Sequence, residues 1–223
     1  MSEKPAQTEA TSTRVRRRPL SLGTDCLDKM LNFEIHDNPV YSGLEIQVFD
    51  DETHGKGNLV FVSRADSGLT DVYHEPGLRL DPSGYEIGSG LGHWAETTFH
   101  PSLVEFAPNG VGVDLGFIDR SGRSVRIKLD DRGGRARHGA PFLAPMGAAI
   151  ESPNRLPLVW MNRFDLVRDR GQFEATIEGQ PVEIGRLPGA FLHRRRLVKY
   201  ASDLFVVAVN PSYEGQIGSA TLS

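Results

Sequence analysis

The chain has 223 residues, of which 39% are hydrophobic, and its 24 glycines and 14 prolines suit one large β domain with many turns. Its net charge of −4 argues against a protein that is coated overall by nucleic acid or anionic lipid. The single cysteine, Cys26, excludes an internal disulfide, and no stretch approaches the roughly 18 apolar residues of a membrane span. We therefore expect a cytoplasmic protein with no membrane association.

The first twenty residues differ in composition from the rest of the chain. Ser2–Thr13 is rich in Ser, Thr, Glu, Ala and Gln without apolar periodicity, and Arg16–Arg18 adds a basic cluster. This composition predicts that residues 1–20 form a disordered basic tail. An export signal would need an apolar run after the arginines, and Pro19 does not begin one. Residues 21–223 are expected to form a single β domain.

The first element expected after the tail is one short helix over Cys26–Leu31. Leu27 and Leu31 stand four residues apart, behind Thr24 and Asp25, either of which can cap a helix. A series of short strands follows, separated by turn residues. These candidates are Leu44–Phe49, Leu59–Val62, Thr70–His74, Leu78–Leu80, Leu91–Phe99 and Leu103–Phe106.

Strict alternation of apolar and polar residues is clearest at Val111–Asp119 and Ser124–Asp130. A period of two is the pattern of a strand with one face on a core. Arg120–Arg123 joins these strands into a hairpin, and the turn Glu178–Pro181 predicts a second hairpin within Phe173–Ile184. The remaining strand candidates are Leu158–Val167, Arg194–Tyr200 and Leu204–Val209.

Residues 131–157 divide the strand candidates into two blocks. Asp131–Gly139 is glycine-rich and basic, which predicts a mobile surface loop, and Ala140–Pro157 carries four prolines, which predicts an irregular connection. About eleven strands must protect their edges, either by closing into a barrel or by stacking two sheets. The predicted fold class is therefore all-β, an antiparallel barrel or a strongly curved two-sheet architecture. A barrel wide enough to hold a ligand is favoured.

The densest polar cluster is Gly92–His100. On a helix His93, Glu96 and His100 would share one face and form a metal site, whereas on a strand Trp94, Glu96 and His100 share a face. The β-branched pair at 97–98 and the nearby glycines favour the strand, so we expect no metal. Trp94, Glu96 and His100 are then expected to line one wall of a cavity, although a solvated polar face is the simpler alternative.

Gly92-His93-Trp94 is similar to the Gly-x-Trp signature that lipocalins carry near their first strand. The resemblance covers three residues in the middle of the chain, with no further lipocalin signature, so no family is assigned. The expected barrel or curved two-sheet architecture is accordingly described as lipocalin-like.

Two other strand candidates contain carboxylates, and one interpretation is that these carboxylates face an enclosed cavity. Asp71, Tyr73 and Glu75 share a face, and two carboxylates beside a phenol can serve acid–base chemistry if burial raises their pKa values. The alternative is the solvated face of an edge strand. Asp114 stands between Gly112 and Gly116, and these glycines leave room for a ligand or for a neighbouring strand.

Two further segments combine side chains that can recognise a ligand. Trp160 and Asn162 share a strand face and can contact a partly apolar ligand, while Arg163 and Asp165 are most simply a surface ion pair. The run His193–Lys199 can join the basic tail and Asp131–Gly139 in an anion-binding stripe. Because no aromatic residues are interleaved with it, we interpret it as a solvated strand and do not expect nucleic-acid binding.

No motif of known catalytic mechanics is present, including nucleotide-binding loops and nucleophile elbows. The leading hypothesis is a β-barrel that binds an apolar small molecule and isomerises, cyclises or hydrates it by acid–base chemistry without a cofactor. The catalytic candidates are Glu96, His100 and Asp114, and the ligand-binding candidates are Trp94, Tyr73, Trp160 and Asn162. A non-catalytic binding module and an interaction protein that uses its basic tail and loops are the alternatives. Whether the chain forms a homo-oligomer stays open.

Overall fold

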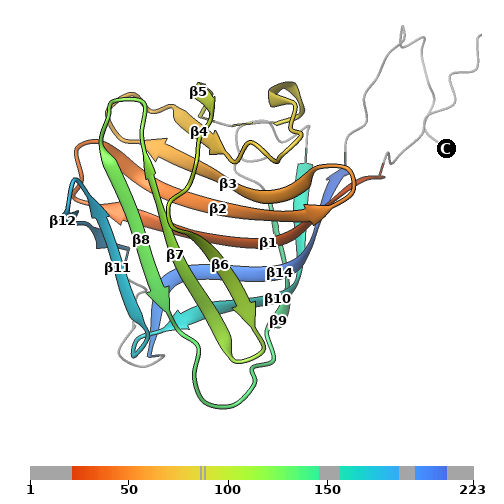
Figure 1. The fold of residues 1–223 in the computed structure, drawn as a ribbon. Coiled ribbons are helices and arrows are strands. Elements are labelled where there is room, and N and C mark those ends of the chain that lie inside the picture. Colours follow the sequence, from red (N-terminus) through yellow and green to blue (C-terminus); the bar gives the residue numbers. More distant parts are fainter. Residues whose placement is uncertain (1–21, 86, 88, 146–155, 186–193, 210–223) are drawn as a thin grey trace, which may run out of the picture.

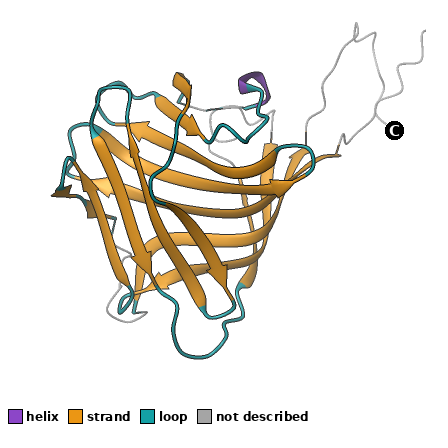
Figure 2. Ribbon diagram, in the orientation of Figure 1, coloured by secondary structure: helices purple, strands orange, loops and turns teal. Residues whose placement is uncertain are grey.

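Residues 22–85, 87, 89–145, 156–185 and 194–209 are those that the structure, a computed structural model, describes. In this part of the chain the regular elements are strands, apart from one turn of 3-10 helix, η1, at Pro82–Gly84. The strands form two sheets that pack against each other (Figures 1 and 2). The predicted all-β class is therefore confirmed. The expected tail at 1–20 lies outside the described residues, and no described helix is long and apolar enough to cross a membrane.

The larger sheet has nine strands and is strongly curved (Figure 1). Its order is β5-β4-β3-β2-β1-β14-β10-β9, and β13 pairs with β1 beside this path. Neighbouring strands are antiparallel, except that β4 and β5 run parallel. The strands are β1 Leu22–His36, β2 Tyr41–Asp51, β3 Gly55–Arg64, β4 Thr70–His74, β5 Leu91–Glu96, β9 Ala140–Pro145, β10 Leu156–Arg168, β13 Glu183–Ile184 and β14 Arg195–Val209.

The smaller sheet has five antiparallel strands in the order β12-β11-β8-β7-β6. Both sheets draw strands from each side of residues 131–157, so the two blocks of the sequence are not the two layers of the fold. Among the described residues no pairing joins the sheets into a closed barrel, and the fold has the two-sheet form. The strands are β6 Ser102–Ala107, β7 Gly110–Ile118, β8 Ser124–Asp130, β11 Gln172–Ile177 and β12 Gln180–Pro181.

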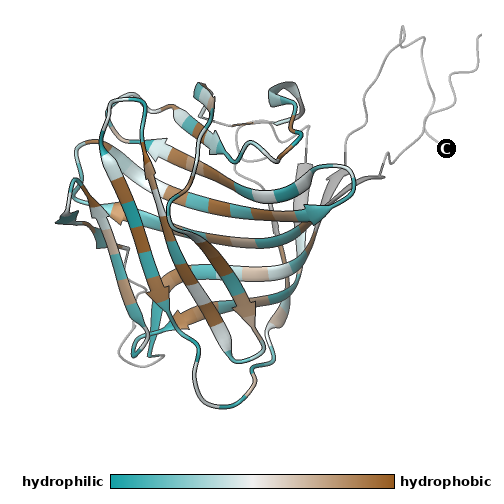
Figure 3. Ribbon diagram, viewed as in Figure 1, coloured by the Kyte–Doolittle hydropathy of each residue, from teal (hydrophilic) through white to brown (hydrophobic). Residues whose placement is uncertain are grey.

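The main core lies between the two sheets. Leu115 of β7 and Ile127 of β8 are fully buried there, where they meet Val60 and Val198 from the larger sheet. Buried and solvent-facing residues alternate along β8, and its hydropathy alternates with them (Figure 3). The period of two in the sequence therefore arises as expected, because one face of the strand packs on the core and the other faces solvent.

A second apolar cluster covers the opposite face of the larger sheet. Leu59 and Val72 pack there with Leu78, which belongs to the long connection between β4 and β5. β3 is therefore apolar on both faces, which explains why Leu59–Val62 is a continuous apolar run. The expectation of a strand at Leu78–Leu80 is wrong, because these leucines lie in a loop over this cluster.

The helix expected over Cys26–Leu31 is also wrong, because this segment lies within the long strand β1. A spacing of four between Leu27 and Leu31 fits a helix, but in the strand the two leucines lie on opposite faces, Leu27 in the second apolar cluster and Leu31 in the main core. Phe33 and Ile35 continue the alternation from Leu31 and are buried with it in the main core. β1 pairs with β2 on one side and β14 on the other, and these distant partners favour the strand.

A strand also occupies part of the connection that was expected to be irregular. β9 pairs only with β10, at the edge of the larger sheet. Its residues Pro141 and Pro145 have no N–H to donate, which an edge strand tolerates because one of its sides has no partner strand. Residues 146–155 of this connection lie outside the described part of the chain.

Both predicted hairpins are present, although the second is short. β7 and β8 pair from Gly112 opposite Asp130 to Ile118 opposite Ser124. In the second hairpin, φ is 51° at Glu178 and 75° at Gly179, which is the left-handed pair that a two-residue hairpin turn of type I′ requires. After β12 the chain leaves the smaller sheet and pairs with β1 of the larger sheet as β13.

Candidate functional site

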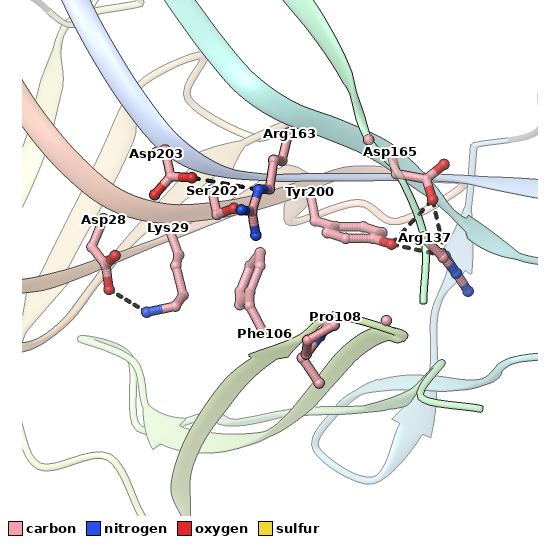
Figure 4. Close-up of a pocket in the computed structure, with 13 residues that line it drawn as sticks. Asp28, Lys29, Phe106, Pro108, Arg137, Arg163, Asp165, Tyr200, Ser202 and Asp203 are labelled. Atoms are coloured by element: carbon pink, nitrogen blue, oxygen red, sulfur yellow. Dashed lines mark hydrogen bonds and ion pairs between the residues drawn. The ribbon is translucent and has the colours of Figure 1, made fainter. Parts of the chain in front are cut away.

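A cleft of about 280 Å³ opens where the β6–β7 turn of the smaller sheet approaches the middle of β1, β10 and β14 (Figure 4). The loop between β8 and β9 contributes to the same cleft, so both sheets and one connection build it. Its walls are formed by Asp28, Lys29, Phe106, Ala107, Pro108, Gly110, Arg137, Gly139, Arg163, Asp165, Tyr200, Ser202 and Asp203. None of the site residues that the sequence analysis selected is among them.

The cleft depends on a local interruption of strand alternation in β14. Asp203 has a φ of 55°, which lies in the left-handed region, so the neighbours Ser202 and Asp203 both line the cleft. Lys29 of β1 and Arg163 of β10 are both paired opposite Ser202, so three adjacent strands present side chains at the same level. A strict period of two would have placed one residue of each consecutive pair on the other face of the sheet.

A hydrogen-bonded network of Arg137, Tyr200 and Asp165 forms one end of the cleft (Figure 4). Arg137 Nη1 donates to Tyr200 Oη at 2.8 Å and to Asp165 Oδ2 at 3.1 Å. Tyr200 Oη in turn donates to Asp165 Oδ2 at 3.2 Å. Burial and the nearby Asp165 carboxylate raise the pKa of Tyr200 to about 12, so its phenol is neutral and a hydrogen-bond donor near neutral pH.

Asp131–Gly139 forms a loop, as expected, and hydrogen bonds of Arg137 attach this β8–β9 loop to the rest of the fold. The Arg137 amide donates to the carbonyl of Pro108 at 2.7 Å, and its Nη2 donates to Asp131 Oδ2 at 2.6 Å. Asp131 is buried and also accepts from Arg168 Nε at 2.8 Å. Burial lowers the pKa of Arg137, but the hydrogen bond to Asp131 and the nearby Tyr200 and Asp165 together outweigh this, and the pKa lies above its ordinary value.

The other end of the cleft carries two more ion pairs. Lys29 pairs with its neighbour Asp28, and Arg163 Nε lies 3.7 Å from Asp203 Oδ2. The six charged side chains of the cleft therefore balance, since three are cationic and three are anionic. The interpretation of Arg163 and Asp165 as a pair with each other is wrong, because Asp165 pairs with Arg137 and Arg163 with Asp203.

An apolar wall faces these charges. Phe106 of β6 packs edge-on against Tyr200 of β14, with ring centroids 5.7 Å apart and planes at 69°. Ala107 and Pro108 continue this wall along the β6–β7 turn. The arrangement suits a compact ligand that has an apolar body and a polar end, because aromatic and aliphatic walls with a few fixed polar groups are typical of small-molecule sites.

The predicted cluster at Gly92–His100 does not form a common wall. Trp94 is half-buried against His74 and Tyr85 in the second apolar cluster, while Glu96 and His100 are exposed. The expectation of one strand through Phe99 is wrong, because β5 ends at Glu96 and a common strand face cannot extend to His100. Among the described residues, no group of three or more His, Cys, Asp or Glu is placed to hold a metal ion.

Tyr73 and its neighbour Asp71 are buried in the structure, on the side of β4 that faces the smaller sheet. Tyr73 Oη accepts a hydrogen bond from the Arg120 amide at 3.0 Å, which attaches the β7–β8 turn to the larger sheet. Asp71 pairs with Arg64 at 3.1 Å and with Arg120 at 3.2 Å. These contacts give the pair a role in joining the two sheets, at a distance from the cleft lining.

Asp114 lies on the outer face of the smaller sheet, where it pairs with Arg126 at 2.6 Å. The room beside Gly112 and Gly116 is already occupied. A Cβ at Gly112 would lie 2.7 Å from Arg132 Nε, and a Cβ at Gly116 would lie 2.8 Å from the carbonyl oxygen of His100. The two glycines therefore allow an arginine side chain and a neighbouring backbone to approach the strand closely.

Trp160 and Asn162 stand on β10 but outside the cleft lining. Trp160 Nε1 donates to Asn162 Oδ1 at 2.8 Å, and both side chains are exposed. The residues of β10 that do line the cleft are Arg163 and Asp165. Trp160 and Asn162 are therefore on a strand that lines the cleft, but at positions that do not face it.

Arg137, Asp165 and Tyr200 were not found from the sequence because 63 residues separate Arg137 from Tyr200 and 35 separate Asp165 from Tyr200. No local motif contains any two of them. Comparison with known protein families, with characterised proteins and with solved structures finds no match to this chain.

Proposed function

We propose that the protein binds a compact amphipathic small molecule in the cleft between its two sheets and acts as a binding module. The observation that carries this proposal is the cleft itself, where an apolar wall at Phe106 faces the fixed polar network of Arg137, Tyr200 and Asp165. The lipocalin-like idea of a ligand held inside a curved β wall is retained as part of this proposal.

The lining constrains the ligand in two ways. At about 280 Å³ the cleft is near the lower end of the roughly 300–1,000 Å³ range of small-molecule pockets, so the ligand is compact. The charged side chains of the cleft balance, so a ligand with several charges of one sign would gain little from them. A neutral or zwitterionic molecule with one planar apolar part fits this lining best.

The chemistry of the network favours binding over catalysis. Tyr200, with a pKa of about 12, retains its proton near neutral pH and can orient a carbonyl or hydroxyl group by hydrogen bonding. The acid–base roles of Glu96, His100 and Asp114 stay predictions, and none of these residues lines the cleft. We therefore place no isomerase, cyclase or hydratase step in the cleft.

The test uses the neutral fluorescent amine N-phenyl-1-naphthylamine as the probe, because it has an apolar body and one N–H donor. Ser202→Trp fills the cleft from β14, while Phe106→Ala removes part of the apolar wall. We expect saturable binding to the unmodified protein, loss of binding in Ser202→Trp, and about tenfold weaker binding in Phe106→Ala, which corresponds to about 1.4 kcal/mol.

Phe142→Ala is the matched control, because Phe142 is an aromatic residue that is 45% exposed and stacks on Phe164 outside the cleft. It should leave probe binding unchanged. Circular dichroism and thermal melts of each variant verify that the fold is retained. If folded Ser202→Trp binds the probe as tightly as the unmodified protein does, the cleft is not the binding site and the proposal fails.

A further inference from the structure

Three segments that are far apart in the sequence form one arginine-rich end of the molecule. The β8–β9 loop at 131–139 contacts the β10–β11 turn through Arg168, which donates to Asp131 and to the Gly133 carbonyl at 2.8 Å. The turn in turn contacts the beginning of β14, where the Asp169 amide donates to the Arg194 carbonyl at 2.9 Å. We call this surface the arginine end, and its members are Arg132, Arg135, Arg137, Arg168, Arg170, Arg194, Arg195 and Arg196.

The arginine end is strongly basic in a chain whose net charge is −4. Residues 131–139, 168–171 and 194–196 contain eight arginines and two carboxylates, Asp131 and Asp169, and three carboxylates outside these segments pair with them, which leaves an excess of three positive charges. Such a local excess of positive charge in an acidic protein creates a field that attracts anions to this surface. The sequence shows the three basic segments separately, and the fold brings them together.

Most of these arginines are already engaged. Arg137 and Arg168 pair with Asp131, Arg195 Nε lies 3.7 Å from Asp165, and Arg196 donates to the Asp169 carbonyl at 2.9 Å. Arg132 pairs with Glu105 and Asp130. In contrast, Arg135, Arg170 and Arg194 are exposed and form no ion pair within the described part of the chain.

Two guanidinium groups of the arginine end, those of Arg168 and Arg170, lie close to the backbone of Gly134, which has no side chain. A Cβ at Gly134 would lie 3.6 Å from Arg170 Nη2 and 3.8 Å from Arg168 Nη1, and the φ of Gly134 is 77°. Within the described residues, the amides of Gly134 and Arg135 donate no hydrogen bond. Free backbone N–H groups beside a left-handed residue, next to guanidinium groups, are suited to bind an anion.

We propose that the arginine end binds a small phosphate-bearing ligand, a phosphomonoester or a diphosphate, at Gly134 with Arg135 and Arg170. The two unpaired guanidinium groups of Arg135 and Arg170, with the backbone N–H groups at Gly134, match the roughly two negative charges of a phosphomonoester. Guanidinium groups also suit phosphate because they donate two parallel hydrogen bonds to its oxygens. A nucleic-acid strand fits less well, because residues 131–139, 168–171 and 194–196 contain no Phe, Tyr or Trp on which a base can stack, and their one ring side chain is His138.

The test measures binding of inorganic pyrophosphate, inorganic phosphate and phenyl phosphate by isothermal titration calorimetry on the full chain. We expect saturable binding of at least one of these probes at one site. Arg170→Gln and Arg135→Gln should each weaken it about fivefold, as loss of one charged contact at an exposed site implies. Arg170→Lys, which keeps the charge, should recover part of the affinity. If phenyl phosphate binds more tightly than phosphate, the ligand class is a phosphomonoester. If phosphate or pyrophosphate binds more tightly, the ligand class is free phosphate or a diphosphate.

Arg126→Gln is the matched control, because Arg126 is an arginine on the outer face of β8 that pairs with Asp114. If it weakens binding as much as Arg170→Gln does, the binding is only general charge attraction and the proposal is wrong. Absence of saturable binding of every phosphate probe, or binding only of a single-stranded oligonucleotide, also overturns it. Circular dichroism and thermal melts verify that each variant is folded, so this proposal can fail independently of the cleft.

Discussion

Asp131 is a buried carboxylate that joins the cleft to the arginine end. Its side chain has no exposed surface, and it accepts hydrogen bonds from Arg137 Nη2, Arg168 Nε and the Arg168 amide at 2.6, 2.8 and 3.0 Å. The guanidinium groups of Arg137 and Arg168 are themselves largely buried, with 12% and 14% of their side chains exposed. Replacement of Asp131 by Asn keeps the shape of the side chain but removes the carboxylate that pairs with Arg168 and one of the two that pair with Arg137.

Removal of one partner from a buried ion pair costs about 3–5 kcal/mol, because the remaining charge stays buried without compensation. Since Asn retains one acceptor oxygen, we expect Asp131→Asn to destabilise the protein by about 3 kcal/mol. In a chain of this length each 1 kcal/mol lowers the melting temperature by roughly 2–4 °C, so the loss is about 6–12 °C. Urea unfolding followed by circular dichroism gives the free energy directly.

Asp130→Asn is the control, because Asp130 is the neighbouring aspartate, pairs with Arg132 and is 48% exposed. An exposed pair contributes at most about 1 kcal/mol, so this change should have a small effect. A loss of less than about 1 kcal/mol in Asp131→Asn, or equal losses in the two variants, would refute the idea that Asp131 holds the loop against the sheets.

Two further predictions concern the cleft and the core. Because the pKa of Tyr200 is raised to about 12 in the fold from about 10 in an unfolded chain, its contribution to stability is complete below pH 10 and is lost as the pH rises toward 12. Urea unfolding between pH 9 and pH 12 should therefore show a steeper loss of stability in the unmodified protein than in Tyr200→Phe, and equal slopes would contradict the assignment. Ile127 is fully buried between the sheets, so Ile127→Ala should cost about 2–5 kcal/mol. Leu103, on β6 of the same sheet, is 48% exposed, so Leu103→Ala should cost no more than about 0.5 kcal/mol in the same assay, and similar losses in the two variants would contradict the two-sheet core.

The strands that were predicted well are those whose environment is encoded locally. Val125, Ile127 and Leu129 alternate with exposed polar residues, and one face of β8 covers the core while the other meets solvent. The turn at Glu178–Gly179 was recognisable for a similar reason, because Gly179 readily adopts the left-handed backbone that a short hairpin needs. In both cases the physical cause lies within a few residues of the chain.

The errors occurred where a local pattern is compatible with two structures. The spacing of Leu27 and Leu31 fits a helix, but pairing with β2 and β14 makes the segment a strand that buries the two leucines in different clusters. Pro141 and Pro145 argued against any strand, yet they are tolerated in β9 because it lies at the edge of the larger sheet. Whether a strand lies at the edge or in the middle of a sheet depends on the assembled fold, and the residues of a short segment do not determine it.

The all-β class, the β7–β8 hairpin and the basic character of three separate segments follow from the order of residues alone, since each depends on side-chain alternation, turn preference or charge within a short stretch. The cleft and the arginine end depend on which strands become neighbours. Arg137, Asp165 and Tyr200 meet because β14 pairs with β10 and because Asp131 draws the β8–β9 loop onto the sheets. The free energy that brings such distant groups together comes from burial of the core shared by both sheets, so their meeting is a property of the whole fold.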